Sequence, residues 1–188
     1  MMIKKILYIL LVLKFFPFVL FYISSKERII SDITSFSNHY KFRYNNIFTL
    51  VYLLEKIPEF RNVFYLRYRK AFWLRFLFHG VSNLYFFVPS EKVGKGLMLW
   101  HGYSTSVNAI SIGDNCEIWQ NVTIGKKTTL PIPDKPIIGN NVKVCANAVV
   151  IGPIHIGDNS TIGAGAVVNK DIPANSIAVG NPFKILSK

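Results

Sequence analysis

A six-residue repeat of aliphatic side chains runs through the second half of the 188-residue chain. Eleven valine, isoleucine or leucine residues recur at this interval in three blocks: Val93 and Leu99; Ile112, Ile118 and Ile124; and Ile138, Val144, Val150, Ile156, Ile162 and Val168. An amphipathic helix cannot produce this spacing, because its apolar positions recur every three or four residues. The repeat predicts a parallel β-helix, in which each hexad forms one strand and one corner and its aliphatic residue points inward.

The repeat is interrupted twice. One extra residue falls between Leu99 and Ile112, in a stretch that begins with His101, and an insertion over 126–136 separates Ile124 from Ile138. Loops that leave a regular scaffold are where a protein of this kind can place functional groups. We therefore expect the insertion to fold back towards His101.

The N-terminal half differs in composition from the repeat. Residues 1–90 hold 13 Lys/Arg and 4 Asp/Glu, whereas residues 91–188 hold 9 and 6. An 18-residue apolar run, Ile6–Ile23, is just long enough to span a bilayer, but Lys14 and Pro17 interrupt it. A helix lying in the membrane interface, a poorly tolerated span and a helix packed within the protein all remain open. We favour contact with a membrane surface.

Two further helices are expected in this half. Residues 47–56 form the first, which ends before Pro58, and the second extends from Glu59 towards His79, with Gly80 as a stop. Residues 64–78 alternate Arg and Lys with aromatic side chains, a pattern that suits an anionic membrane surface. A solvated helix face with buried aromatic residues is the plain alternative, and no recognised nucleic-acid-binding motif is present.

These observations divide the chain into three parts. Residues 1–24 form an apolar segment that associates with a membrane, 25–90 a helical basic and aromatic region, and 91–188 the β-helix. The fold class is mainly β with an α-helical N-terminal part. Cys116 and Cys145 form no CxxC motif and the four histidines have no zinc-site spacing, so no metal and no disulfide framework are expected.

The motifs "GKGLMLWHG", "IGDNCEIWQNVTIG", "IGAGAVV" and "GNPFKI" resemble those of the hexapeptide-repeat acyltransferases, and most of all the serine acetyltransferase branch. The likeness covers about residues 81–188. It implies a left-handed parallel β-helix, a homotrimer with active sites between subunits, and acetyl-CoA as co-substrate. A cytoplasmic enzyme at the inner face of the membrane is the expected location.

The resemblance also implies site residues. His101 matches the catalytic histidine, and an imidazole suits a general base because its ordinary pKa lies near neutrality. Ala146 and Ala164 fall where main-chain groups contact the pantetheine arm of the coenzyme, and Lys184 is expected to meet its phosphates. Cys116 occupies a repeat position and is expected in the core rather than as a nucleophile.

The chain departs from the serine acetyltransferases at the residues that hold the amino acid. Trp100 replaces an aspartate that meets the substrate ammonium, and Asp134–Lys135 replaces an arginine–histidine pair that helps to hold its carboxylate. Phe86 replaces an acidic residue that orients the histidine. We therefore expect Trp100, Asp134 and Lys135 to bind a saccharide acceptor used in cell-surface polysaccharide synthesis. A serine O-acetyltransferase and a non-catalytic β-helical membrane scaffold are the alternatives.

Overall fold

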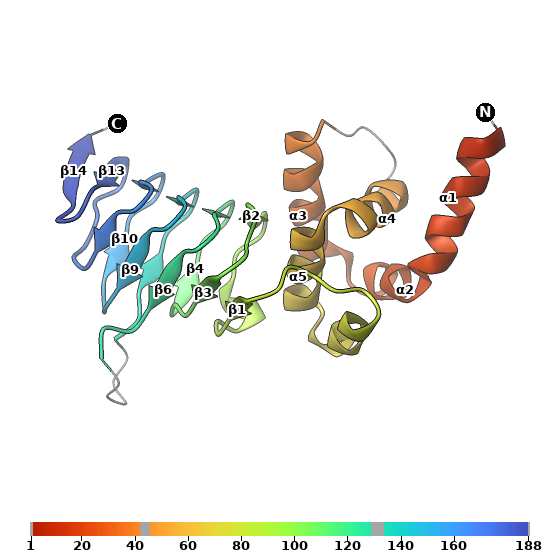
Figure 1. Ribbon diagram of the computed structural model, residues 1–188, viewed down its shortest axis with the longest axis horizontal. Helices are drawn as coiled ribbons and strands as arrows, with labels where there is room; N and C mark the ends of the chain where they lie inside the picture. The colour runs from red at the N-terminus through yellow and green to blue at the C-terminus, as the bar shows by residue number, and fades with distance from the viewer. Residues whose placement is uncertain (1, 42–45, 129–133, 188) are drawn as a thin grey trace. The chain divides into compact units, whose positions relative to one another are not determined.

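The structure is a computed structural model that describes residues 2–41, 46–128 and 134–187 (Figure 1). It divides the chain into two compact units, a helical unit over residues 1–80 and a β-helical unit over residues 81–188. The β-helical unit therefore begins ten residues before residue 91, the start expected from the repeat. Its first strand, β1 (Leu84–Phe86), already pairs in parallel with β3.

The β-helical unit is a left-handed parallel β-helix built from three sheets (Figure 1). Sheet A contains β1, β3 (Thr105–Val107), β6 (Thr123–Gly125), β9 (Val149–Ile151) and β12 (Val167–Val168). Sheet B contains β4 (Ser111–Ile112), β7 (Ile137–Ile138) and β10 (His155–Ile156). Sheet C contains β2 (Met98–Leu99), β5 (Glu117–Ile118), β8 (Lys143–Val144), β11 (Thr161–Ile162), β13 (Ser176–Val179) and β14 (Lys184–Ser187).

Each coil of the chain passes from sheet C to sheet A and then to sheet B before it returns to sheet C. The parallel register stacks the aliphatic repeat residues on one another, and all eleven are at most 5% exposed. Burial of stacked aliphatic side chains is the main source of stability in such a coil. The inward-facing assignment of the repeat is confirmed.

Asparagine residues line the corner between sheets B and C. Asn115, Asn141, Asn159 and Asn175 have φ angles between 53° and 59°, in the left-handed region that asparagine tolerates well. The side-chain amides of the first three each donate a hydrogen bond to the next asparagine along the column, at 3.4, 3.0 and 3.0 Å. The corner is therefore stabilised between coils as well as within them.

Glycine at the end of sheet B allows the coils to approach closely. A Cβ atom on Gly113 would lie 2.6 Å from the carbonyl carbon of Gly139 and 2.6 Å from Asn140 Oδ1. That Oδ1 atom accepts a hydrogen bond from the Asp114 backbone N–H at 2.9 Å. The "IG" of the repeat is thus explained by packing between successive coils.

The first break in the repeat is larger than the sequence predicts. Ser106 follows Leu99 by seven positions, whereas Thr123 follows Ile118 by five at the equivalent positions of the next coil. The corner from β2 to β3 therefore holds two extra residues. Ile112 follows Val107 by five positions, whereas Ile156 follows Val150 by six at the equivalent positions of a later coil, so one residue is missing between β3 and β4. Because two residues are inserted and one is missing, the sequence shows a net excess of only one. Val107, which is fully buried, was therefore not recognised as a member of the repeat.

The helical unit contains five α-helices and one 3₁₀-helix in its described residues. They are α1 (Met2–Lys14), α2 (Phe16–Ser24), α3 (Lys26–His39), α4 (Asn46–Lys56), α5 (Pro58–Arg67) and the 3₁₀-helix η1 (Arg69–Phe76). The expected helix over 47–56 is confirmed as α4. Within the described residues, no helix has both the length and the apolar character needed to cross a membrane.

The helix expected from Glu59 to His79 is wrong in its second half, because α5 ends at Arg67 and a 3₁₀-helix follows. Ala71 and Leu74 are fully buried, and their three-residue spacing matches the three residues per turn of a 3₁₀-helix. Tyr68, between the two elements, leaves the helical region with ψ of 75°, and its phenol donates a hydrogen bond to the Ser25 carbonyl at 2.7 Å.

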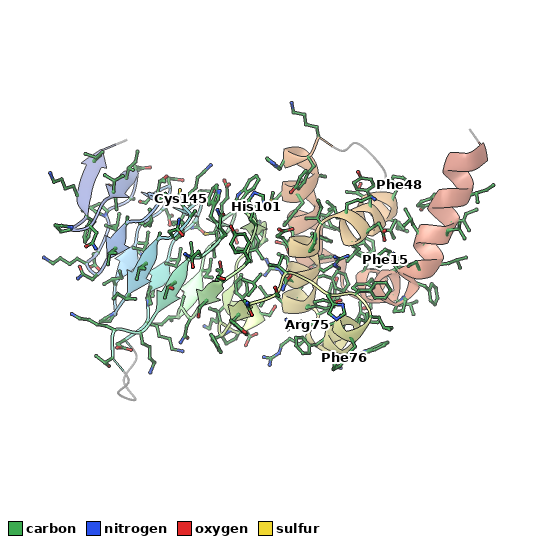
Figure 2. All side chains as sticks on the ribbon, in the orientation of Figure 1. Phe15, Phe48, Arg75, Phe76, His101 and Cys145 are labelled. Atoms are coloured by element: carbon green, nitrogen blue, oxygen red, sulfur yellow. The ribbon has the colours of Figure 1, made fainter. Side chains whose placement is uncertain are left out.

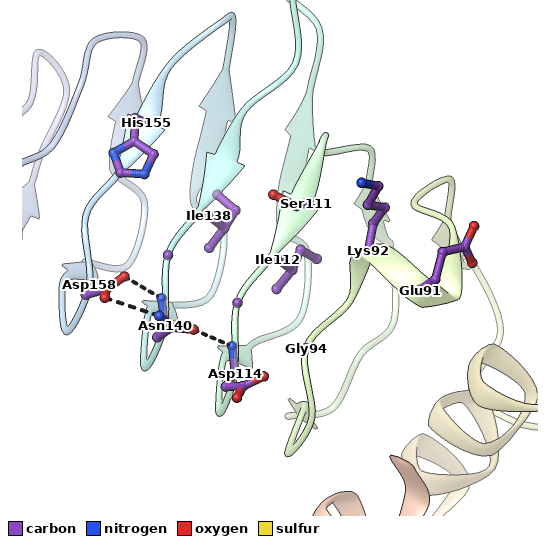
Figure 3. A pocket seen from close by; sticks show the side chains of 12 residues that line it. Glu91, Lys92, Gly94, Ser111, Ile112, Asp114, Ile138, Asn140, His155 and Asp158 are labelled. Atoms are coloured by element: carbon purple, nitrogen blue, oxygen red, sulfur yellow. Dashed lines mark hydrogen bonds between the residues drawn. The ribbon is translucent and has the colours of Figure 1, made fainter. Parts of the chain in front are cut away.

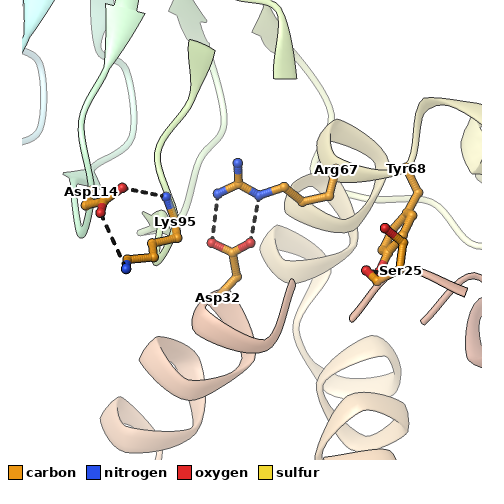
Figure 4. A network of polar contacts seen from close by, with 6 residues as sticks. All are labelled: Ser25, Asp32, Arg67, Tyr68, Lys95 and Asp114. Atoms are coloured by element: carbon orange, nitrogen blue, oxygen red, sulfur yellow. Dashed lines mark hydrogen bonds and ion pairs between the residues drawn. The ribbon is translucent and has the colours of Figure 1, made fainter. Parts of the chain in front are cut away.

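A buried ion pair connects α3 to the end of α5 (Figure 4). The Arg67 guanidinium donates to both carboxylate oxygens of Asp32, at 2.7 and 2.9 Å, and both side chains are at most 1% exposed. Around it the core is aromatic, and Phe18 contacts Phe64 with ring centroids 5.0 Å apart. A bidentate pair of this kind fixes the chain direction just before η1 begins.

Candidate active site

His101 lies in the enlarged corner between β2 and β3. Its φ is +53°, and in the described part of the β-helical unit it is the one residue other than Gly, Asn and Ser with positive φ. Its side chain is exposed, and the imidazole has no hydrogen-bond partner among the described residues. A bulky residue held in this backbone region is uncommon and marks a candidate functional position.

Hydrogen bonds fix the corner that carries His101. The Trp100 backbone N–H donates to the Ile118 carbonyl at 2.9 Å, and the Asn121 N–H donates to the Tyr103 carbonyl at 2.9 Å. The Thr105 hydroxyl lies 3.2 Å from the Tyr103 carbonyl. The two extra residues are therefore held on both sides by the neighbouring coil.

The Trp100 side chain is the centre of a cluster on the outer side of sheet C. Its indole stacks on Trp119, with ring centroids 5.5 Å apart and an interplanar angle of 18°. Its Nε1–H donates to Glu117 Oε2 at 2.8 Å, and Glu117 Oε1 pairs with Lys143 Nζ at 2.8 Å. The carboxylate beside Trp100 is thus already paired with a cation from this chain.

The predicted coenzyme residues Ala146 and Ala164 occupy the same corner as His101, on later coils. The Gly165 N–H bonds to the Ala146 carbonyl at 3.0 Å, and the Asn147 N–H bonds to the Gln120 carbonyl at 3.1 Å, so the corners stack in register. The strands β2 and β8 are two positions apart in sheet C, which corresponds to about 9–10 Å. In Figure 2 His101 and Cys145, the neighbour of Ala146, lie along one edge of the β-helix.

The other predicted site residues do not lie at this corner. Asp134 and Lys135 belong to the insertion between β6 and β7, which leaves the coil between sheets A and B. The expectation that the insertion folds back towards His101 falls partly on residues 129–133, which lie outside the described residues. Lys184 begins β14, after the last coil, and is exposed.

The Asp134 carboxylate is bound within its own loop. Oδ2 accepts hydrogen bonds from the backbone N–H of Thr128 at 2.7 Å and from its hydroxyl at 2.9 Å. Burial raises the pKa of the Asp134 carboxyl, but the Thr128 hydrogen bonds and Lys126 outweigh it, so that the pKa is lowered overall. Asp134 therefore connects the end of the insertion to its beginning at Thr128.

Both thiols are poor candidates for a nucleophile. Cys116 is fully buried, as expected from its repeat position, and burial raises the pKa of its thiol to about 11. Burial also raises the pKa of the half-buried Cys145 thiol. The arrangement at the corner supports proton transfer by an imidazole rather than a covalent acyl-enzyme.

Sequence reasoning missed three residues that the structure brings to this corner: Glu117, Trp119 and Gln120. Gln120 Oε1 is buried without a hydrogen-bond partner among the described residues. Trp119 lies 19 residues after Trp100, close to the length of one coil of three hexads. That separation is the signal that could have paired the two indoles before the structure was known.

A shallow depression of about 460 Å³ lies on the outer side of sheet B and contains none of the predicted site residues (Figure 3). Asp158 Oδ1 accepts a hydrogen bond from the Asn140 backbone N–H there, at 2.7 Å. The Asn140 hydrogen bonds lower the pKa of Asp158, and the exposed His155 contributes in the same direction. These polar groups join successive coils, so we assign the depression to the scaffold.

Comparison with known proteins agrees with the repeat and the fold. Residues 135–170 match the family model described as bacterial transferase hexapeptide (six repeats). The crystal structure of Neisseria gonorrhoeae serine acetyltransferase matches with a TM-score of 0.66, at 27% identity, over 85% of this chain and 64% of that chain. The β-helical unit thus has the repeat and the fold of the hexapeptide-repeat transferases.

Among these transferases, the curated relatives are serine acetyltransferases. That of Helicobacter pylori is 40% identical over 101 residues, which are 53% of this chain and 59% of that protein. That of Synechococcus elongatus is 38% identical over 99 residues, which are 52% of this chain and 41% of that protein. The chain spans about half the length of the curated relatives that it matches.

Proposed function

We propose that this protein is an acetyl-CoA-dependent O-acetyltransferase in which His101 is the general base. The observation that carries the proposal is the position of His101, an exposed imidazole on a left-handed residue in a corner with two extra residues. The similarity to serine acetyltransferases supports the same reaction class.

The chemistry requires one proton to move twice. The neutral imidazole takes the proton of the acceptor hydroxyl while that oxygen attacks the thioester carbonyl carbon. The tetrahedral intermediate then collapses, the carbon–sulfur bond breaks, and the imidazolium returns the proton to the departing sulfur. The products are the acetyl ester and free coenzyme A, and no protein side chain is acylated.

The edge of the β-helix that carries His101 is where we place the thioester of acetyl-CoA. Ala146 and Ala164 follow His101 along one edge of the coil, and small side chains leave their main-chain groups accessible to an extended pantetheine arm. Lys184 is exposed, as a residue that meets coenzyme phosphates must be. These roles are part of the proposal.

For the acceptor we propose a saccharide hydroxyl. At the position where the serine acetyltransferases have an aspartate, this chain presents an indole stacked on a second indole. The nearby Glu117 carboxylate is neutralised by Lys143 and engaged by the Trp100 N–H. An amino-acid ammonium would compete with that lysine, whereas an aromatic wall suits the apolar face of a sugar ring. Because Trp119 covers one face of the Trp100 indole, we propose that the two indoles together form the surface that contacts the sugar.

L-Serine is the second candidate acceptor, and the names of the curated relatives favour it. On that hypothesis the pocket is divergent and other groups hold the amino acid. A homotrimer supports either acceptor, because it would bring the insertion of one subunit close to the His101 corner of another.

The test is thiol release from acetyl-CoA with free L-serine and with a panel of mono- and oligosaccharides as acceptors. We expect turnover with a saccharide and little with serine. His101→Ala should fold normally and lower turnover by about 10²–10⁴-fold. An unchanged rate would contradict the role of His101, and no acetyl-CoA turnover at all would favour a non-catalytic scaffold. Preference for serine would select the second candidate.

A further inference from the structure

The first two helices together expose seven large apolar side chains, which we call the α1–α2 stripe. Its members are 50–64% exposed and are spaced three or four residues apart: Ile6, Ile9, Leu10, Leu13, Phe16, Leu20 and Ile23. The opposite side of α2 buries Phe18, Val19 and Tyr22 in the core of the helical unit. Both sides of this segment are therefore apolar, and one of them faces outward.

The one charged residue within Ile6–Ile23 is withdrawn from the stripe by an ion pair. Lys14 Nζ lies 2.6 Å from Glu55 Oε2 on α4. The sequence suggests that this lysine interrupts the apolar run, but in the structure it is a link to the next helix. Basic residues instead flank the run in sequence, with Lys4 and Lys5 before it and Lys26 and Arg28 after it.

A second exposed surface combines aromatic and basic side chains on and just after η1. Phe72, Trp73, Phe76 and Leu77 are 53–83% exposed. Arg69 and Lys70 are exposed beside them, and the Arg75 guanidinium lies 5.5 Å from the centroid of the Phe72 ring. Residues 60–90 contain no aspartate or glutamate. This surface is thus positively charged as well as apolar.

The two surfaces belong to elements that touch. The ring of Phe78, which follows η1, packs on Phe15 and Phe18, with centroid distances of 4.9 and 5.4 Å. The Tyr65 phenol also donates to the Phe78 carbonyl at 2.6 Å, so the end of η1 is anchored to the core. The exposed residues are therefore presented by a rigid support.

We propose that the helical unit docks on the surface of an anionic lipid bilayer without crossing it. The α1–α2 stripe would enter the boundary between headgroups and acyl chains, and the exposed Arg69 and Lys70 side chains would meet anionic headgroups. Charge selects this occupant over a second copy of the chain. Residues 1–80 hold 13 Lys/Arg and 4 Asp/Glu, a charge of +9, so two such units repel while an anionic surface attracts each of them.

The experiment is flotation of the full-length protein with vesicles of phosphatidylcholine alone and with 30% phosphatidylglycerol. We expect binding to the anionic vesicles that salt weakens. The double variant Leu13→Asn/Leu20→Asn should lower partitioning at least tenfold, since both side chains are exposed and their replacement leaves the core intact. Arg69→Gln/Lys70→Gln should lower it by roughly tenfold on anionic vesicles and have little effect on neutral ones.

The matched control is Ile185→Asn/Leu186→Asn, which replaces two similarly exposed apolar residues of the β-helical unit and should bind like the wild type. Circular dichroism should show unchanged helix content in every variant. The proposal is overturned if the wild type does not float with anionic vesicles, or if the stripe variant floats equally well. It also fails if the stripe variant instead lowers the particle mass in light scattering, which would make the stripe a protein interface.

Discussion

At the scale of single residues, the Trp100 side chain, next in sequence to His101, is fixed by two residues of the following coil. The proposed base makes no side-chain hydrogen bond in the described structure. Trp100 is instead held by stacking on Trp119 and by the Glu117 carboxylate. We therefore expect Glu117 to act as a positioning residue, which holds Trp100 beside the proposed base.

We expect Glu117→Ala to lower kcat by roughly tenfold or more, because small displacements of a catalytic group are costly. KM for acetyl-CoA should change little, since the proposed coenzyme residues Ala146 and Ala164 lie on later coils. Glu117→Gln should restore most of the rate, because its amide oxygen can still accept the Trp100 N–H bond. Steady-state kinetics on the purified full-length protein would measure both parameters.

Lys95→Gln is the control for this prediction. It removes an exposed ion pair on the same unit, with Lys95 Nζ 3.8 Å from Asp114 Oδ2, and exposed pairs contribute little (Figure 4). If Glu117→Ala raised KM for acetyl-CoA and left kcat unchanged, a positioning role would be wrong.

Single residues were predicted unevenly from the sequence. His101 could be found because a break in a regular repeat and a motif coincide there. The Glu117–Trp100–Trp119 cluster could not be read from hexad spacing, because it forms between outward side chains on adjacent coils. Asp134 was expected at the substrate, but its Thr128 hydrogen bonds are local to a loop and left no signature in the repeat.

At the scale of elements, the close contact between coils at the end of sheet B makes a clear stability test. Gly113→Ala would place a Cβ atom 2.6 Å from the Gly139 backbone, so one coil must shift. We expect the free energy of unfolding of the β-helical unit to fall by about 1–3 kcal/mol, as for other overpacked sites. Chemical denaturation of wild type and variant would measure the difference.

Gly125→Ala is the matched substitution, because a Cβ atom there meets no atom within 4 Å. Its effect should stay within about 0.5 kcal/mol. Equal losses for the two variants would show that the repeat glycines act through backbone freedom rather than through contact between coils.

The helical unit should lose stability in alkali because of two phenols. Burial raises the pKa of Tyr65 and of Tyr68 to about 12, and both hydroxyls donate to backbone carbonyls while protonated. A folded-state pKa above the unfolded value of 10.0 gives stability that is present below pH 10 and lost as the pH rises towards about 12. Denaturation followed at 222 nm between pH 9 and 12 should show this decline.

Tyr65→Phe/Tyr68→Phe should flatten that pH dependence and lower the stability at neutral pH, because two hydrogen bonds are lost. Tyr85→Phe, at an exposed ring of the other unit, should leave the helical signal unchanged. A decline of the same slope in the double variant would assign the alkaline loss to other groups.

The elements followed from the sequence where one periodicity dominates. The strands of the β-helix were predicted because each hexad repeats the same inward aliphatic position. The prediction of one helix from Glu59 to His79 was wrong because the buried residues change from α-helical to three-residue spacing at Ala71 and Leu74. Two residues are too few to reveal a new periodicity in the sequence. The first coil was missed because an insertion and a deletion nearly cancel.

At the scale of the whole molecule, the predicted site residues of one β-helical unit lie at two different edges. His101 lies between sheets C and A, and Lys135 lies in the insertion between sheets A and B. If both contribute to one site, the two must come from different copies of the chain. We expect a homotrimer, and light scattering should give three times the monomer mass.

Co-expression of His101→Ala with Lys135→Ala provides a functional test of this arrangement. Each variant alone should be impaired, while mixed assemblies should recover part of the activity, because some of their sites combine two intact edges. Co-expression of two copies of the His101→Ala variant is the control, and it should give no recovery. A fully active monomer, or no recovery in mixed assemblies, would place each site within one subunit.

The reversed direction of β14 has a consequence for solubility. A stack of parallel coils ends in a strand whose backbone groups could template another chain, and such edges favour fibril growth. β14 pairs antiparallel with β13 from Ser176↔Ser187 to Val179↔Lys184, so the last strand of sheet C no longer presents the register of the coil. The exposed lysine on this strand further discourages edge-to-edge addition. We therefore expect β14 to hinder the addition of another chain to this edge of the β-helix.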